Sequence, residues 1–393
     1  MHLKQSWRQP RRPWRVRVGL LYIVLLSLVV GLLGGCTSET SPSSTGASAP
    51  STEAPATTQP PTTEATTRVL TDMAGREVVV PAKVERVFSA IPIGTVLLYT
   101  LDPAILCAKN FDLSDMERLY TVDSYQALPV MGTYIVGDTT NIEELLELKP
   151  DVVLYAGFIN DQWKTQVYAA QKRLGIPVVM VDSALDKTPE TYTLIGELIG
   201  QETRAKELSD YCKNTIDEAK QISATIDSAR SIYYAAGEVL STYAKGSIHS
   251  ELIDFVGGDN VVVVESKSPF ARVTVVWEQL LNWNPDMIIT NSPHTRGGAA
   301  SDVRTELLTN SKYSDMTAVQ NSEVFTIPCA PFNWFGEPPS VARILGIKWL
   351  GSLMYPDKYD YDMVAETKAF YSKFYHLELT DAQFDQITEN SLR

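Results

Sequence analysis

The stretch IEELLELKPDVVL at residues 142–154 returns later in the chain as WEQLLNWNPDMII at residues 277–289. The second copy lies 135 positions after the first (277 minus 142), and Glu, the first and second Leu of the motif, Pro and Asp recur at matching places. Each copy is typical of a helix that ends before a proline and leads into a buried strand. A period of this length is far longer than that of stacked short repeats. The stretch therefore predicts a duplicated αβ unit, with one copy in each half of a folded region.

Short apolar runs surround both copies and alternate with helical patterns. Runs of four or five apolar residues without polar alternation are typical of parallel strands that helices cover on both faces. The expected strands are residues 86–90, 104–108, 151–155, 177–181, 231–235, 260–264, 286–290 and 323–327. Four strands in each half predict an α/β fold with two lobes, each built on a parallel-type sheet.

One long helix is expected between the two halves. Residues 203–228 contain no Gly or Pro, and apolar residues recur there every three or four positions. A helix of that length would extend about 39 Å, enough to run along both lobes as a strut that permits only modest hinge motion. After the last strand, helices are expected over residues 341–355 and 361–375, packed mainly on the second lobe.

The N-terminal end differs in composition from the rest. A basic segment is followed by an apolar run over residues 18–33 and then by Gly34, Gly35 and Cys36. This pattern predicts a lipoprotein signal peptide over residues 1–36 that ends at a lipidated Cys36, with an uncleaved membrane anchor as the alternative. Either segment places the remainder outside the cytoplasm, anchored to the cell membrane.

A tether and three folded segments are expected after Cys36. Residues 37–67 consist almost entirely of Ser, Thr, Pro, Ala and Glu, which predicts a disordered tether. We expect an N-terminal lobe over residues 68–187, a linking helical segment with the interdomain helix over residues 188–230, and a C-terminal lobe with terminal helices over residues 231–393.

Charge and cysteine content exclude several classes of partner. The chain has 47 acidic against 34 basic residues and a formal net charge of -13, which opposes binding to nucleic-acid phosphates. Besides Cys36, the widely spaced Cys107, Cys212 and Cys329 predict no disulfide framework. No cluster of His and Cys has the spacing of a metal site, so neither a resident metal nor a cofactor is expected.

In this order and spacing, the repeat and its flanking motifs resemble class III periplasmic binding proteins. These are the binding proteins of ABC importers for ferric siderophores, haem and vitamin B12, and one long helix joins their two lobes. The resemblance covers residues 68–355 and rests on the segments 71–81, 84–87, 141–143, 149–151, 257–260 and 284–286. It implies a protein, not an enzyme, that captures a metal chelate between its lobes and delivers it to an ABC permease dimer.

The candidate ligand contacts lie in loops that follow the expected strands, because such loops form the walls of a cleft in open α/β sheets. Those loops hold the aromatic residues Phe111, Tyr134, Phe158, Tyr243, Phe270, Phe332, Trp334 and Phe335. Of these, the resemblance implies ligand contacts at Tyr134, Phe158, Tyr243, Phe270 and Trp334. Arg272 and Arg296 are the expected cationic contacts, because a guanidinium group binds carboxylate, catecholate or oxyanion oxygens with two parallel hydrogen bonds.

Glu143 and Glu278 occupy the same place in the two copies of the repeat. The duplication predicts one carboxylate on top of each lobe, and the resemblance implies that the pair docks onto the two permease subunits. Taken alone, each glutamate is also explained by the favourable interaction of its charge with the dipole of a helix whose first turn it occupies.

Two alternatives to chelate capture remain open. One is a binder of a molybdate-type oxyanion in the same transporter class, and the other is a secreted lipid-anchored enzyme or adhesin. The segment from Gly246 to Ser250 lacks the second Gly of a nucleophile elbow, so the sequence does not favour an enzyme.

Overall fold

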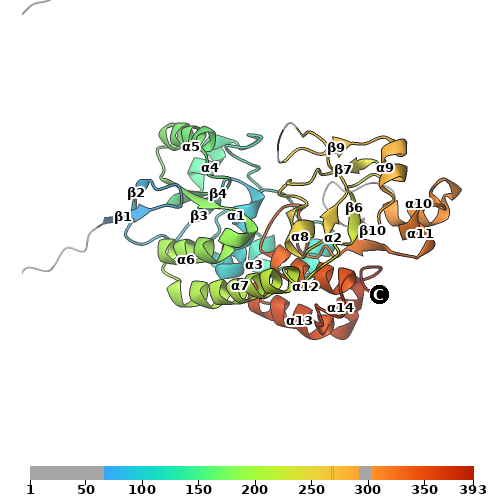
Figure 1. The fold of residues 1–393 in the computed structure, drawn as a ribbon. Coiled ribbons are helices and arrows are strands. Elements are labelled where there is room, and N and C mark those ends of the chain that lie inside the picture. The colour runs from blue at the N-terminus through green and yellow to red at the C-terminus, as the bar shows by residue number, and fades with distance from the viewer. Residues whose placement is uncertain (1–65, 267, 269, 292–301) are drawn as a thin grey trace, which may run out of the picture. The chain divides into compact units, whose positions relative to one another are not determined.

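The computed structural model describes residues 66–266, 268, 270–291 and 302–393. The expected signal peptide, Cys36 and nearly all of the expected tether therefore lie outside the described residues. Residues 63–393 form one compact unit, whose elements are drawn in Figure 1. In the described part of the chain, no helix is both long enough and apolar enough to cross a membrane.

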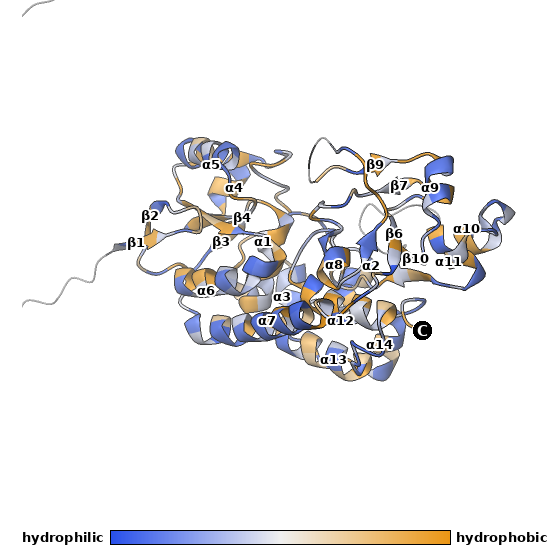
Figure 2. Cartoon of the chain, viewed as in Figure 1, coloured by the Kyte–Doolittle hydropathy of each residue, from blue (hydrophilic) through white to orange (hydrophobic). Residues whose placement is uncertain are grey.

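The first half of this unit builds a parallel sheet of three strands. In sheet order they are β3 (Val87–Ser89), β4 (Val152–Gly157) and β5 (Val178–Asp182). Every residue of β3 and β4 is buried, as expected for strands that are covered on both faces. Figure 2 colours β4 mainly as hydrophobic and the outer helix α5 (Asp161–Leu174) mainly as hydrophilic.

The other elements of this half surround the sheet. They are β1 (Thr67–Thr71), β2 (Glu77–Pro81), α1 (Pro92–Leu101), η1 (Pro103–Ile105), α2 (Asp115–Leu119), α3 (Asp123–Gln126), α4 (Ile142–Glu147) and η2 (Leu185–Lys187). The strands β1 and β2 form an antiparallel hairpin.

The strand expected at residues 104–108 does not form. The chain instead makes the 3-10 turn η1, where the Asp102 carboxylate accepts the N–H of Ala104 at 2.9 Å. Only one bridge to the sheet follows, between Leu106 and Val87. Pro103 has no N–H to donate to a neighbouring strand, and a side-chain cap beside it favours a turn. The prediction of four strands in the first half was therefore wrong.

The second half has a parallel sheet in the order β11 (Val324–Ile327), β10 (Met287–Asn291), β6 (Ser231–Ala235) and β8 (Asp259–Asn260). Alternate residues face two different apolar cores. Ile232 and Tyr234 of β6 belong to a core that continues into the first half, whereas Tyr233 belongs to a smaller core confined to the second half. One face of this sheet is therefore joined to the first lobe through continuous packing.

Strand β8 is shorter than the expected strand at residues 260–264. The Asn260 side-chain oxygen accepts the N–H of Val262 at 3.0 Å and turns the chain away from the sheet. The other elements up to β11 are β7 (Ser241–Thr242), α8 (Glu251–Phe255), β9 (Val273–Thr274), α9 (Trp277–Trp283), α10 (Val303–Thr309), η3 (Ser311–Tyr313) and α11 (Thr317–Gln320).

Helices α6 (Thr188–Ile199) and α7 (Glu202–Ser223) connect the two halves and pack on each other. Helix α7 takes the place expected for the strut and contacts both α1 and α8. It ends at Ser223, before the expected end at residue 228. The Thr225 hydroxyl donates to the carbonyl of Ile222 at 2.8 Å, a local bond that competes with continued helix.

The terminal helices are α12 (Ala342–Met354), α13 (Met363–Phe370), the π-helical turn η4 (Tyr371–Tyr375) and α14 (Asp381–Ile387). They pack on both lobes, which corrects the expectation that they pack mainly on the second. The Tyr99 hydroxyl of α1 donates to the carbonyl of Tyr375 at 3.2 Å, and Tyr120 donates to Gln386 at 2.8 Å. The reason is that η4 carries large aromatic side chains, which the first lobe helps to bury.

Arg343 of α12 ties the two lobes together at this shared core. Its side chain is 2% exposed and donates to the carbonyl of Ser183, just after β5, at 2.8 Å. It also forms an ion pair with Glu251 of α8. One guanidinium group therefore bonds to both halves of the fold.

Replacing Arg343 by Met should lower the free energy of unfolding by about 3 kcal/mol, because Glu251 keeps a partly buried charge without its partner. Urea unfolding measures this loss. Lys206→Met is the control, since Lys206 pairs with Asp210 at 2.7 Å but is 74% exposed, and it should change stability by less than about 1 kcal/mol. Equal effects of the two substitutions would contradict a structural role for the Arg343 bonds.

Candidate functional site

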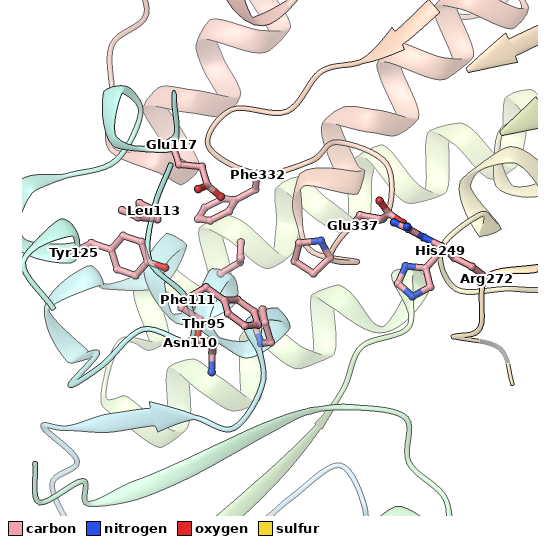
Figure 3. Close-up of a pocket in the computed structure, with 13 residues that line it drawn as sticks. Thr95, Asn110, Phe111, Leu113, Glu117, Tyr125, His249, Arg272, Phe332 and Glu337 are labelled. Carbon is pink, nitrogen blue, oxygen red and sulfur yellow. The ribbon is translucent and has the colours of Figure 1, made fainter. Parts of the chain in front are cut away.

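A pocket of about 290 Å³ lies where the two lobes face each other. The first lobe contributes the side chains Pro92, Thr95, Val96, Asn110, Phe111, Leu113, Glu117 and Tyr125, and the second contributes His249, Arg272, Phe332, Glu337 and Pro338. Most of these groups are apolar or aromatic. Figure 3 shows His249, Arg272 and Glu337 gathered on one side of the pocket, away from Leu113 and Tyr125. The site therefore has a largely apolar body, a polar end formed by His249, Arg272 and Glu337, and the Glu117 carboxylate on the opposite side.

The wall from the first lobe is built around Asn110. Its side-chain amide donates to the carbonyl of Ser89 at 2.9 Å and to that of Gly132 at 2.8 Å. Its side-chain oxygen accepts the hydroxyl of Thr95 in α1 at 2.6 Å. With its polar groups satisfied inside the wall, Asn110 holds the next residue, Phe111, at the pocket, where Phe111 is 40% exposed.

The polar end is assembled from strand ends of the second lobe. Strands β7 and β9 pair antiparallel, with Thr242 opposite Val273. Continuing that register by one residue places Tyr243 opposite Arg272. The Arg272 Nε atom does donate to the Tyr243 hydroxyl, at 3.0 Å.

Glu337 is the centre of this polar end. Its Oε1 atom accepts the Tyr243 hydroxyl at 2.6 Å and Arg272 Nη2 at 2.6 Å. Its Oε2 atom accepts the side-chain amide of Asn291, the last residue of β10, at 2.6 Å. Asn291 in turn accepts the hydroxyl of Tyr234 from β6. The carboxyl ends of parallel strands thus converge on one carboxylate, as is typical of sites in open α/β sheets.

The turn that presents Glu337 depends on Asn333 and Gly336. The Asn333 side-chain oxygen accepts the backbone N–H groups of Phe335 and Gly336, both at 2.8 Å. A Cβ atom on Gly336 would lie 2.7 Å from the carbonyl oxygen of His249, so only glycine allows this close approach. The approach lets the His249 Nδ1 atom donate to the carbonyl of Gly336 at 2.5 Å.

Because a carbonyl oxygen only accepts, that bond assigns the ring proton of His249 to Nδ1 and leaves Nε2 as the nitrogen with a lone pair. Burial lowers the pKa of His249, which keeps the ring neutral near pH 7. Burial also opposes the charge of Arg272, but its hydrogen bonds and charge pairing with Glu337 outweigh burial and raise the pKa of Arg272. The polar end therefore combines a neutral imidazole with a guanidinium group that is paired to a carboxylate.

Several residues predicted from the sequence come together near this end. Arg272 lines the pocket. Tyr243 lies beneath it, 4% exposed, with its ring stacked on that of His249 at a centroid distance of 4.5 Å. Phe158 of the first lobe and Phe270 of the second meet each other at 4.6 Å between ring centroids, and Phe270 also contacts the His249 ring. These two phenylalanines join the lobes beside the pocket and are not part of its lining.

The structure does not bring Tyr134 or Trp334 to the pocket. Tyr134 is 2% exposed, because its backbone N–H bonds to Ala90 and draws the residue into the first lobe. Trp334 is completely buried, since its loop folds back over α12 and the indole packs against Tyr371. Neither side chain is part of the lining of this pocket. Arg296 lies outside the described residues.

Glu337, His249, Phe111 and Phe332 line the pocket but were not among the predicted contacts. Phe111 and Phe332 belonged to the wider set of loop aromatics, and spacing alone could not separate them from the buried members of that set. The Asn-x-x-Gly-Glu order at residues 333–337 is the signal that could have pointed to Glu337, because Asn and Gly there predict a tight turn.

Glu143 and Glu278 are both exposed residues in the first turns of α4 and α9. The leucine two residues after each glutamate, Leu145 or Leu280, is completely buried, so the two copies of the repeat seat their helices alike. Figure 1 draws α4 and α9 on the same side of the two lobes, away from α7, α12 and α13.

Comparisons with known proteins agree with this architecture. The periplasmic binding protein family matches residues 118–331. The molybdate-binding protein MolA of Haemophilus influenzae is 25% identical over 342 residues, which cover 78% of this chain and 91% of MolA. The haem uptake protein IsdE of Staphylococcus aureus is 26% identical over 242 residues, or 60% of this chain and 77% of IsdE. A solved ABC transporter solute-binding protein from Sulfurospirillum deleyianum superposes with a TM-score of 0.73 at 27% identity, covering 81% of this chain and 98% of that one.

Because Trp334 and Phe111 are placed differently, their substitution by Ala should lower the free energy of unfolding by different amounts. Trp334→Ala should lower the free energy of unfolding by about 3 to 5 kcal/mol, because it empties a fully buried position. Phe111→Ala should cost about 1 kcal/mol or less, because the ring is 40% exposed. Urea unfolding of both variants gives the comparison. A larger loss for Phe111→Ala than for Trp334→Ala would contradict the assignment of these rings to wall and core.

Proposed function

The chain belongs to the periplasmic binding protein family, and on this premise we propose that it captures a metal chelate between its lobes for delivery to an ABC importer. Members of the family are extracytoplasmic solute-binding proteins of ABC transporters and are not enzymes. The chelates considered are a ferric siderophore, haem or a cobalamin-like corrinoid. The observation that carries the proposal is the pocket between the lobes, with apolar and aromatic walls and one polar end.

A chelate suits these walls because it presents a broad organic surface around a metal that is already coordinated. Phe111, Tyr125 and Phe332 offer aromatic contacts to such a surface. At the polar end, Arg272 can donate to ligand oxygens, and His249 Nε2 can accept a hydrogen bond or approach the metal. Phe158 and Phe270 would close the side of the pocket beside His249.

Capture needs no large rearrangement of the lobes. The core that joins one face of the second sheet to the first lobe, together with the Arg343 bonds, opposes wide opening. We therefore expect a small closure around the ligand and release without chemical change.

A molybdate-type oxyanion is the second candidate ligand, because MolA is 25% identical over 78% of this chain. An oxyanion needs several convergent donors or uncompensated cations. The described pocket lining offers one guanidinium group, which already pairs with Glu337 at 2.6 Å. This pairing favours the chelate over the oxyanion.

Calorimetric titration of the full-length chain in detergent with haem, a ferric siderophore, cobalamin and molybdate tests the two ligand classes. For the ligand that binds, Arg272→Gln should weaken affinity about tenfold or more, because a charge-assisted hydrogen bond is lost. Arg173→Gln is the matched control, since Arg173 pairs with Asp138 on the surface and is 62% exposed. Equal affinities for Arg272→Gln and wild type would exclude Arg272 as a contact, and binding of molybdate alone would replace the chelate assignment.

The lipid anchor remains part of the proposal. The signal pattern that ends at Cys36 supports cleavage before this residue and lipidation of its thiol, with the segment between Cys36 and β1 as a tether to the membrane. A lipid anchor would keep the loaded protein close to an importer in the same membrane.

Glu143 and Glu278 are the proposed contacts with the two permease subunits. Both side chains are exposed, and in the described part of the chain neither forms an ion pair. Each lies one helical turn before an exposed leucine, Leu146 at 41% and Leu281 at 39%, so each lobe offers a carboxylate beside an apolar side chain. Two matching patches suit a transporter with two equivalent halves.

The double substitution Glu143→Ala and Glu278→Ala should leave ligand affinity unchanged and reduce uptake through the reconstituted importer, because surface charges govern encounter and specificity. Glu202→Ala is the control, since Glu202 is also a first-turn glutamate but lies on α7. Uptake by the double variant that equals the uptake by Glu202→Ala would remove these residues from the docking surface.

A further inference from the structure

We propose that Glu337 sets the charge of the ligand, so that the pocket accepts a neutral or nearly neutral chelate and rejects polyanionic ones. This inference rests on the proposed capture of a chelate and narrows it to a chemical class. Ferric complexes of three hydroxamate groups are neutral, and corrinoids are nearly so, whereas a ferric complex of three catecholates is a trianion. These ferric complexes differ in charge but are similar in size and shape.

The pocket lining carries few charged groups. Among the lining residues that the structure describes, Arg272 is the one guanidinium group, and the carboxylates are Glu117 and Glu337. The His249 ring is kept neutral by burial. The described lining therefore carries no net positive charge, although one guanidinium group reaches the pocket.

The Glu337 carboxylate is held in place by its neighbours. Its side chain is 8% exposed, and four hydrogen bonds from Tyr243, Asn291 and Arg272 hold both oxygens. A carboxylate whose two oxygens accept this many hydrogen bonds cannot easily turn away. The Asn333 turn fixes the backbone beneath it. The positive charge of Arg272 is thus neutralised by a carboxylate that is held in place.

Binding of an anionic ligand at this end of the pocket is unfavourable. Two of the guanidinium nitrogens, Nε and Nη2, are already bonded to Glu337 and Tyr243, and the side chain as a whole is 39% exposed. A ligand can take a hydrogen bond from the remaining face of Arg272, but a polyanion would also face the Glu337 charge. Glu337 is therefore a positioning residue for Arg272 and a determinant of specificity.

The test compares ligands of different charge on the full-length chain in detergent. Ferrichrome serves as a neutral ferric trihydroxamate, ferric enterobactin as a ferric tris-catecholate trianion, and molybdate as a small dianion. Wild type should bind ferrichrome at least tenfold more tightly than ferric enterobactin. Glu337→Gln should raise the affinity for both anions at least tenfold and change that for ferrichrome less than threefold.

Two further variants separate charge from structure. Glu337→Gln combined with Asn291→Asp moves the carboxylate to the neighbouring residue in the network and should restore the wild-type preference. Glu306→Gln is the matched control, because Glu306 also accepts a tyrosine hydroxyl, that of Tyr313 at 3.0 Å, but lies away from the pocket. It should bind all probes as wild type does.

The outcomes distinguish this inference from the proposed function. If wild type binds no chelate but Glu337→Gln gains affinity for molybdate, the charge-setting role stands and chelate capture fails. If Glu337→Gln shifts the affinities for neutral and anionic probes by the same factor, or if wild type prefers an anion, the inference is overturned even where a chelate binds.

Discussion

The pocket depends on one packing constraint: the second lobe's sheet is buried on both faces, and one of those faces shares its apolar core with the first lobe. Alternate residues of β6, such as Tyr233 and Tyr234, point into different cores. The aromatic turn η4 and the helix α12 fill the space between the lobes. Arg343 of α12 bonds to both lobes. Since a close-packed core resists continuous deformation, the two walls of the pocket keep a nearly fixed separation.

A fixed, largely apolar pocket limits what charges its walls can carry. A lone guanidinium group in such a place would lose hydration without a compensating partner. Here Glu337 supplies the partner, and residues from β6, β10 and the β7–β9 pair supply its hydrogen bonds. The same network that stabilises Arg272 thereby determines which ligand charges the pocket tolerates. Stability and specificity at this end have one physical origin.

Much of the fold could be predicted from periodicity. The repeat at residues 142–154 and 277–289 places α4 before β4 and α9 before β10, and the first leucine of each copy, Leu145 or Leu280, is buried. The failures were local. Pro103 prevented a strand next to β3, the Asn260 side chain turned the chain out of the second sheet, and Thr225 competed with the last turn of the long helix. In each case one side chain or one missing N–H outweighed the apolar pattern around it.

The sequence by itself determined the fold class, the duplicated αβ unit and some of the loops that line the pocket, among them those of Phe111, Arg272 and Phe332, because these depend on local patterns of apolar residues and on turn-forming residues. Only the tertiary structure decided which side chains in those loops face the pocket. Trp334 and Phe332 stand two residues apart in one loop and both are buried, yet of the two Phe332 alone lines the pocket. Glu337 and Arg272, which are 65 positions apart, meet because the β7–β9 pair and the turn after β11 come together in the second lobe. Such contacts arise from long-range packing, which no short stretch of sequence encodes.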